Sequence, residues 1–196
     1  MLSSQRLMKN ILIIIVMSFL SLQTMACVEI NEKSVSIKWT AFKTPAKVGV
    51  SGLLKNIKFN SKLKGKSLSQ IIQSSSFLIK TDKKSIDTKN PARDMKIAQQ
   101  FFMKLKEKGT INGTVKSYKK NKIIVSFNIN GVTKNIPLKT VIKKNQLIAS
   151  GHIDVLDFMM SDALKSLNKA CFAKHEGKTW SDVTLELKAQ FNKCQK

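Results

Sequence analysis

The side chains with the most chemical potential are one cysteine and two histidines. Cys171 and His175 stand four residues apart, and His152 is the other histidine of the chain. Thiolate and imidazole are ligands that zinc prefers, but a zinc site needs three or four ligands at defined spacing. The sequence has no HExxH motif, no pair of CxxC motifs and no recognisable catalytic triad. We therefore expect no catalytic residue, metal or cofactor, and an envelope metal-binding protein or enzyme centred on Cys171 and His175 is the alternative hypothesis.

The first 26 residues differ in kind from the rest. Arg6 and Lys9 precede an apolar run over residues 11–22, and Ala26 supplies the small residue that a signal peptidase requires. This order is typical of a secretory signal. The run of 12 residues is shorter than the roughly 20 that a membrane-spanning helix needs. We predict a signal peptide over residues 1–26, one domain over residues 27–196, and a periplasmic location. Cleavage after Ala26 is preferred, and a lipid anchor through Cys27 is the alternative.

The chain is strongly basic. Of its 35 basic residues 33 follow residue 26, as do all 12 acidic ones, so the formal charge of this part is +21. Most basic residues are scattered lysines, whereas arginine, which reads bases and phosphates better, occurs only at Arg6 and Arg93. We expect no nucleic-acid partner. A solvated lysine-rich surface and attraction to an anionic membrane surface both remain open.

Alternation of apolar and polar residues dominates the rest of the chain, and it predicts half-buried strands. Asn130-Gly131 between two such segments is a strong hairpin signal. Mostly tight turns between strands predict closure into an eight-stranded antiparallel up-and-down barrel, whose interior is filled by side chains or holds one small ligand. The predicted strands cover residues 35–41, 48–54, 77–81, 111–117, 123–129, 136–142, 147–153 and 183–191.

Two segments have helical spacing instead. Asn90-Pro91 reads as an N-cap followed by proline at the first helical position, which predicts an amphipathic helix over residues 91–105. Its expected apolar face carries Met95, Ala98, Phe102 and Leu105. Ser161-Asp162 predicts a short helix with Leu164 and Leu167. The polar stretch over residues 61–75 is expected to be an exposed connection.

Three cysteines cannot all pair within one chain. In an eight-stranded meander the first and last strands lie side by side and antiparallel, which brings the start of the first near the end of the last. If Cys27 carries no lipid, this topology favours a Cys27–Cys194 disulfide. If Cys27 is lipidated, Cys171–Cys194 is the remaining intrachain pair. An oxidising compartment favours pairing of such thiols.

Four segments resemble the YceI-like protein family. Ser85–Asp94 reads SIDTKNPARD and precedes Phe101-Phe102, which is similar to the IDTGN-x-x-RD…FF signature of that family. Ile129–Leu138 reads INGVTKNIPL and resembles its x-G-V-T-K-x-V-x-L hairpin. Val48–Leu53 and Trp180–Leu187 are similar to its V-x-G-x-F element and its final strand.

The resemblance implies a lipocalin-like barrel that is exported to the periplasm and has no chemistry of its own. It also implies an interior that holds a polyisoprenoid, an isoprenoid quinone or a similar long-chain amphiphile, for carriage or storage. A structural barrel filled by side chains is a further alternative, and the oligomeric state stays open. The inward apolar residues expected to contact the lipid are Trp39, Val50, Phe77, Ile79, Val115, Val125, Phe127, Leu138 and Leu185.

Arg93-Asp94 lies inside the clearest of these motifs and has two interpretations. In the functional one, the pair contacts a lipid head group at the mouth of the barrel. In the structural one, which we favour, Asp94 complements the positive N-terminus of the helix and Arg93 ties the loop to the barrel.

Overall fold

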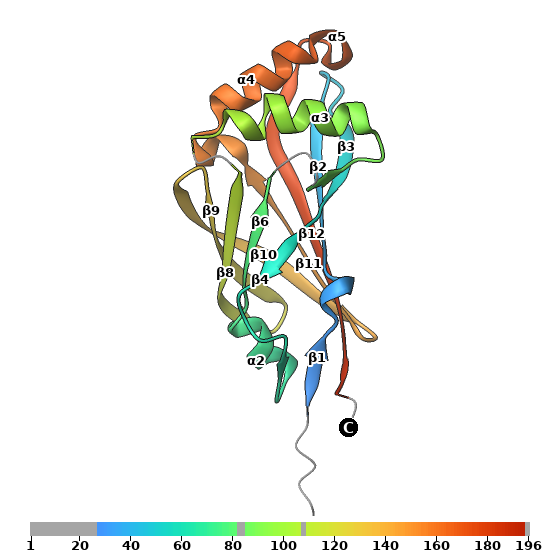
Figure 1. The fold of residues 1–196 in the computed structure, drawn as a ribbon, viewed down its shortest axis with the longest axis vertical. Coiled ribbons are helices and arrows are strands. Elements are labelled where there is room, and N and C mark those ends of the chain that lie inside the picture. Colours follow the sequence, from blue (N-terminus) through green and yellow to red (C-terminus); the bar gives the residue numbers. More distant parts are fainter. Residues whose placement is uncertain (1–26, 82–84, 107–108, 195–196) are drawn as a thin grey trace, which may run out of the picture.

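One curled antiparallel sheet forms the body of the molecule (Figure 1). The computed structural model describes residues 27–81, 85–106 and 109–194, so the predicted signal peptide lies outside the described residues. All eight predicted strands are present. They are β2 (Ser36–Lys43), β3 (Val48–Leu54), β6 (Ser76–Lys80), β8 (Thr110–Lys119), β9 (Lys122–Ile129), β10 (Val132–Lys143), β11 (Gln146–Asp154) and β12 (Thr179–Lys193).

Four short strands complete the sheet: β1 (Val28–Ile30), β4 (Ile57–Phe59), β5 (Lys64–Gly65) and β7 (Ile86–Asp87). The strand order is β4-β6-β8-β9-β10-β11-β12-β2-β3-β7, and β1 pairs with both β12 and β5. The prediction of an eight-stranded closed barrel is therefore wrong, because the described part of the chain forms a 12-stranded half-barrel. Strands of two or three residues are too short to show alternation in the sequence.

The predicted neighbours are otherwise correct, and a bend explains where closure fails. The first and last long strands, β2 and β12, pair antiparallel. After β3 ends, Asn56 adopts a positive φ of 56°, which asparagine tolerates better than most residues. The chain leaves the β2 side at this bend, and β4 pairs with β6 instead. The Asn130-Gly131 turn is confirmed, with φ of 55° and 78°.

The lower part of the half-barrel is a filled core. Phe77 packs its ring edge-on against Phe127, with 6.0 Å between centroids, and Phe59 lies 6.4 Å from Phe77 on the other side. Gly113 is paired with Phe77 across β8 and β6, and a Cβ atom there would lie 2.2 Å from the Phe77 ring. The glycine therefore leaves the space that the phenyl ring occupies.

A short helix closes this filled end. α2 (Leu68–Gln73) begins after Ser67, whose side chain accepts a hydrogen bond from the Gln70 backbone N–H. Ile71 and Ile72 of α2 are buried. The expectation of an exposed connection over residues 61–75 is wrong, because a capped turn with two adjacent isoleucines fits against the end of the sheet (Figure 1).

Helices cover the opposite end of the half-barrel (Figure 1). They are α3 (Pro91–Gln100), α4 (Ser161–Ala170) and α5 (Phe172–His175), with 3₁₀ turns η2 (Phe102–Lys104) and η3 (Val155–Phe158), and a further turn η1 (Glu32–Ser34) lies beside β12. α3 starts at the predicted cap but ends five residues early, so Phe102 and Leu105 follow it. Met95 is exposed rather than on the buried face. No helix in the described part of the chain is long and apolar enough to cross a bilayer.

The two ends of the described part of the chain meet beyond the sheet. Cys27 and Cys194 form a disulfide with a Cα–Cα distance of 5.3 Å, and the Cys194 backbone N–H donates to the Cys27 carbonyl oxygen at 3.1 Å. The predicted Cys27–Cys194 pairing is confirmed, and Cys171 is the free cysteine. A sulfur that is bound to Cys194 cannot also carry a lipid.

Candidate functional site

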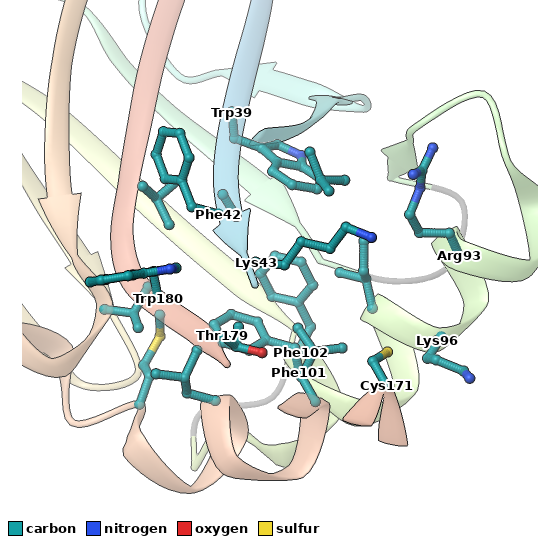
Figure 2. A pocket seen from close by; sticks show the side chains of 18 of the residues that line it. Trp39, Phe42, Lys43, Arg93, Lys96, Phe101, Phe102, Cys171, Thr179 and Trp180 are labelled. Carbon is teal, nitrogen blue, oxygen red and sulfur yellow. The ribbon is translucent and has the colours of Figure 1, made fainter. Parts of the chain in front are cut away.

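A cavity of about 350 Å³ opens between the helices and the upper part of the sheet (Figure 2). Its volume is at the lower end of the range for small-molecule sites, about 300–1,000 Å³. The sheet contributes residues of β2, β3, β11 and β12, and the helical end contributes residues of α3, α4 and α5. The cavity is therefore built by both layers.

The sheet wall follows from strand register. Trp39 on β2 lies across from Leu185 on β12 and from Gly52 on β3, and Ala41 lies across from Val50 and Val183. A Cβ atom at Gly52 would come within 2.6 Å of the Trp39 ring, so the glycine allows the indole to lie against β3. Trp39, Val50, Val183 and Leu185 all line the cavity. Alternation thus directs one row of apolar side chains from three adjacent strands into the same space.

The helices supply the other wall. The apolar side chains that line the cavity from this side are Ile97, Phe101, Phe102, Met160, Leu164 and Leu167. Phe101 and Phe102 pack edge to face with 5.3 Å between centroids, and the Ser166 hydroxyl donates to Gln100 Oε1 at 3.0 Å. The hydrogen bond joins the end of α3 to the middle of α4.

The mouth of the cavity is basic. Lys43, Arg93, Lys96 and Lys174 belong to its lining, and among the described residues that line it none is acidic. Lys43 Nζ donates to the Lys174 carbonyl oxygen at 3.0 Å, and Lys96 Nζ donates to the Ala170 carbonyl oxygen at 3.2 Å. Because these carbonyls lie at the C-terminal ends of α4 and α5, the ammonium groups also complement the helix dipoles. Figure 2 shows the extended Lys43 side chain among the other labelled residues of the lining.

His175 lies at the same mouth and is held by a polar chain. Its Nδ1 is 2.6 Å from Thr179 Oγ1, which donates to Asn168 Oδ1 at 2.8 Å. Since the Thr179 proton is used for Asn168, the His175 Nδ1–H must be the donor to Thr179. Desolvation by burial lowers the pKa of His175 below its usual 6.5, and the positive charges of Lys43 and Lys96 lower it further. The imidazole is thus mainly neutral at pH 7.

The residues considered for a metal site do not converge. Cys171 and His175 both line the cavity, but His152 is exposed on β11 across from Thr184. Within the described ranges, no three side chains of His, Cys, Asp or Glu come together in a way that could hold a metal ion. The metal-binding alternative therefore has no geometric support in this part of the chain.

The signature segment organises the loop before α3. Thr88 donates from its backbone N–H and its hydroxyl to Asp94 Oδ1, at 2.9 and 2.6 Å. Arg93 donates from Nε to Thr88 Oγ1 at 2.9 Å and from Nη2 to the Thr88 carbonyl at 3.0 Å. Asn90 Oδ1 accepts from the Arg93 backbone N–H and caps the helix. Arg93 and Asp94 thus both bind Thr88 and fix the loop before α3, and Arg93 also borders the cavity.

The nine residues expected to contact a lipid fall into two groups. Trp39, Val50 and Leu185 line the cavity. The other six belong to the filled core below it: Phe77, Ile79, Val125, Phe127 and Leu138 are buried there, and Val115 packs against them. Ile97, Phe101 and Leu167 also line the cavity, although none of the three was among the residues expected to contact the lipid. Of these three, Phe101 had a signal in the sequence, namely the Phe101-Phe102 pair of the family signature.

Comparison with known proteins identifies the family. A family model described as YceI-like domain matches residues 28–191. No curated protein matches the chain.

Solved structures show a shared fold at low identity. A polyisoprenoid binding domain from Saccharophagus degradans superposes with a TM-score of 0.58 and 10% identity over 86% of this chain and 99% of that one. BcnA of Burkholderia cenocepacia superposes with a TM-score of 0.55 and 13% identity over 84% of this chain and 99% of that one. A mutant of the Campylobacter jejuni YCEI protein superposes with a TM-score of 0.52 and 21% identity over 76% of this chain and 87% of that one.

Proposed function

The chain belongs to the YceI-like domain family, and from this membership and its apolar cavity we propose that it binds one long-chain apolar amphiphile for carriage or storage. A polyisoprenoid or an isoprenoid quinone is the ligand class we favour. The structural neighbour from Saccharophagus degradans, a polyisoprenoid binding domain, supports this choice. The observation that carries the proposal is the cavity itself, enclosed by two apolar walls and open at a basic mouth.

The chemistry of the walls suits a hydrocarbon chain. Such a chain cannot satisfy buried polar groups, so its site must be lined by side chains that need no hydrogen bond. Val50 and Leu185 from the sheet and Phe101 and Leu164 from the helical end meet this condition. Each CH₂ group taken from water into the site contributes about 0.8 kcal/mol. Because the core below is filled, we place the ligand in the upper cavity between sheet and helices.

Binding accounts for the cavity better than catalysis does. Most of its lining is hydrocarbon, and the His175 Nδ1 is engaged by Thr179. We also propose that the protein works in the periplasm, after removal of residues 1–26. The Cys27–Cys194 disulfide supports this, because such bonds persist in oxidising compartments.

Mass spectrometry of an organic extract from the purified protein tests the proposal. We expect one co-purifying amphiphile at near-stoichiometric amount. Val50→Trp should displace it by filling the cavity, while Val141→Trp, a matched change at an exposed position of β10, should retain it. If the folded Val50→Trp variant carries as much lipid as the Val141→Trp variant, the cavity is not the site. If the unaltered protein yields no amphiphile and takes none up from added polyisoprenoid, the function is wrong.

A further inference from the structure

Large exposed apolar side chains gather at the helical end of the molecule. Met159 before α4 and Phe172 at the start of α5 are 68% and 63% exposed, and Met95 on α3 is 51% exposed. Met103 in η2 and Leu156 in η3 are exposed as well. Contiguous exposed apolar surface on a soluble domain commonly marks an interaction site.

Two of these side chains are next in sequence to residues that line the mouth of the cavity. Phe172 directly follows Cys171 and precedes Lys174, both of which line the mouth, and its ring would lie 3.2 Å from a Cβ atom at Gly177. Met95 precedes the lining residue Lys96, whose ammonium donates to the carbonyl at the end of α4. The side chains of α3 and of the α4–α5 junction therefore meet around one opening.

Basic groups surround the same opening. We define the mouth rim as Met95, Lys96, Phe172, Lys174 and Lys178, all of which are exposed. Lys178 lies over the Trp180 ring with its Nζ 4.6 Å from the centroid. The rim thus combines apolar tips with ammonium groups.

The acidic groups nearby are few or already bound. Glu176 is the exposed acidic residue between the two rim lysines of the α5 region. The Asp94 carboxylate accepts from Thr88, and Asp182 pairs with Lys47 at 3.0 Å. Asp157 and Asp162 lie at the other end of α4.

We propose that the mouth rim docks on an anionic bilayer surface. Apolar tips beside lysines suit the boundary between head groups and acyl chains, where Phe172 and Met95 enter and the lysines meet lipid phosphates. The purpose of this docking rests on the proposed function: with the mouth against the bilayer, a hydrocarbon chain passes between membrane and cavity without crossing water.

Vesicle sedimentation tests the docking surface, with the disulfide-bonded protein freed of bound lipid. The probes are vesicles of phosphatidylcholine alone and of equal parts phosphatidylcholine and phosphatidylglycerol. We expect binding to the anionic vesicles and little to the neutral ones. Phe172→Ser should weaken binding about tenfold. Lys96→Gln with Lys174→Gln should weaken it about fivefold per lysine.

Matched controls come from the opposite end of the sheet. β10 runs into the hairpin with β11, and β11 reaches the helical end only at Asp154. Ile142→Ser removes another exposed apolar side chain, and Lys139→Gln with Lys143→Gln removes two charges. Both controls should bind anionic vesicles within about twofold of the unaltered protein, because surface substitutions outside the docking site have small effects.

Three results would overturn the docking surface. The first is that the unaltered protein binds neither kind of vesicle. The second is that the rim variants bind anionic vesicles as well as the unaltered protein does. The third is that the control variants lose as much vesicle affinity as the rim variants. If Phe172→Ser abolishes a concentration-dependent dimer and leaves vesicle binding unchanged, the face joins two copies of the chain instead. Lipid content is measured separately, so loss of co-purifying lipid with normal vesicle binding refutes the proposed function alone.

Discussion

Replacing Cys27 and Cys194 together by serine should destabilise the protein strongly. The disulfide joins residues 167 positions apart, so its removal frees almost the whole described chain in the unfolded state. The loop-closure relation gives about 5 kcal/mol at 25 °C for a loop of this length. This value is a ceiling, because unfolded chains retain structure, and we expect a loss of about 2–5 kcal/mol.

The loss is measurable by urea unfolding followed through tryptophan fluorescence. Trp39 and Trp180 both lie at the cavity and report on its integrity. Because domains are stable by only about 5–15 kcal/mol, the midpoint should shift clearly. Reductant should lower the stability of the unaltered protein by the same amount and leave the double variant unchanged.

The matched control is Cys171→Ser. Cys171 is unpaired and only half-buried, so its replacement should cost about 1 kcal/mol or less. Equal stability of the double variant and the oxidised unaltered protein would refute the reasoning. It would mean that the β1–β12 ladder alone keeps the two ends together.

Three further predictions concern stability. The lowered pKa of His175 means that the unfolded state binds its proton more readily, so the unfolding free energy should fall as pH drops below 6.5; His175→Gln should flatten this dependence in denaturation series across pH. Lys55 and Lys89 hold the pKa of Asp87 well below its usual range, so its stabilisation is complete above pH 3.8 and fades as pH falls through the lowered value. The melting temperatures of Asp87→Asn and the unaltered protein should therefore differ at pH 7 and converge in acid; a gap that persists in acid would contradict this. Gly113→Ala should cost about 1–3 kcal/mol in urea unfolding because its Cβ meets the Phe77 ring, and Phe77→Leu in the same chain should recover part of that loss.

Local signals in the sequence were sufficient for the long elements. β9 shows why: Ile123, Val125, Phe127 and Ile129 recur at every second position, and all four are buried. Asn130-Gly131 then provides the two positive φ angles of a tight hairpin. These features depend on residues that are close in sequence, so they can be predicted without knowledge of any tertiary contact.

The short elements depended on distant partners instead. β7 has two residues, and it forms because Leu54 on β3 offers a free edge. α2 is stable because Ile71 and Ile72 are buried against the end of the sheet. Neither partner is close in sequence, so no local pattern predicts the pairing.

The sequence by itself determined the strand pattern, the start of α3, the resemblance to the family and the preferred disulfide. It could not separate Trp39 from Val125, because both are inward apolar residues on alternating strands and carry the same signal. Only the tertiary structure decided that Trp39 lines the cavity and Val125 fills the core. The physical reason is depth along the half-barrel: at one end α2 packs against β5 and β8 beside the filled core, whereas at the other end the cavity lies between the sheet and the helices α3 and α4.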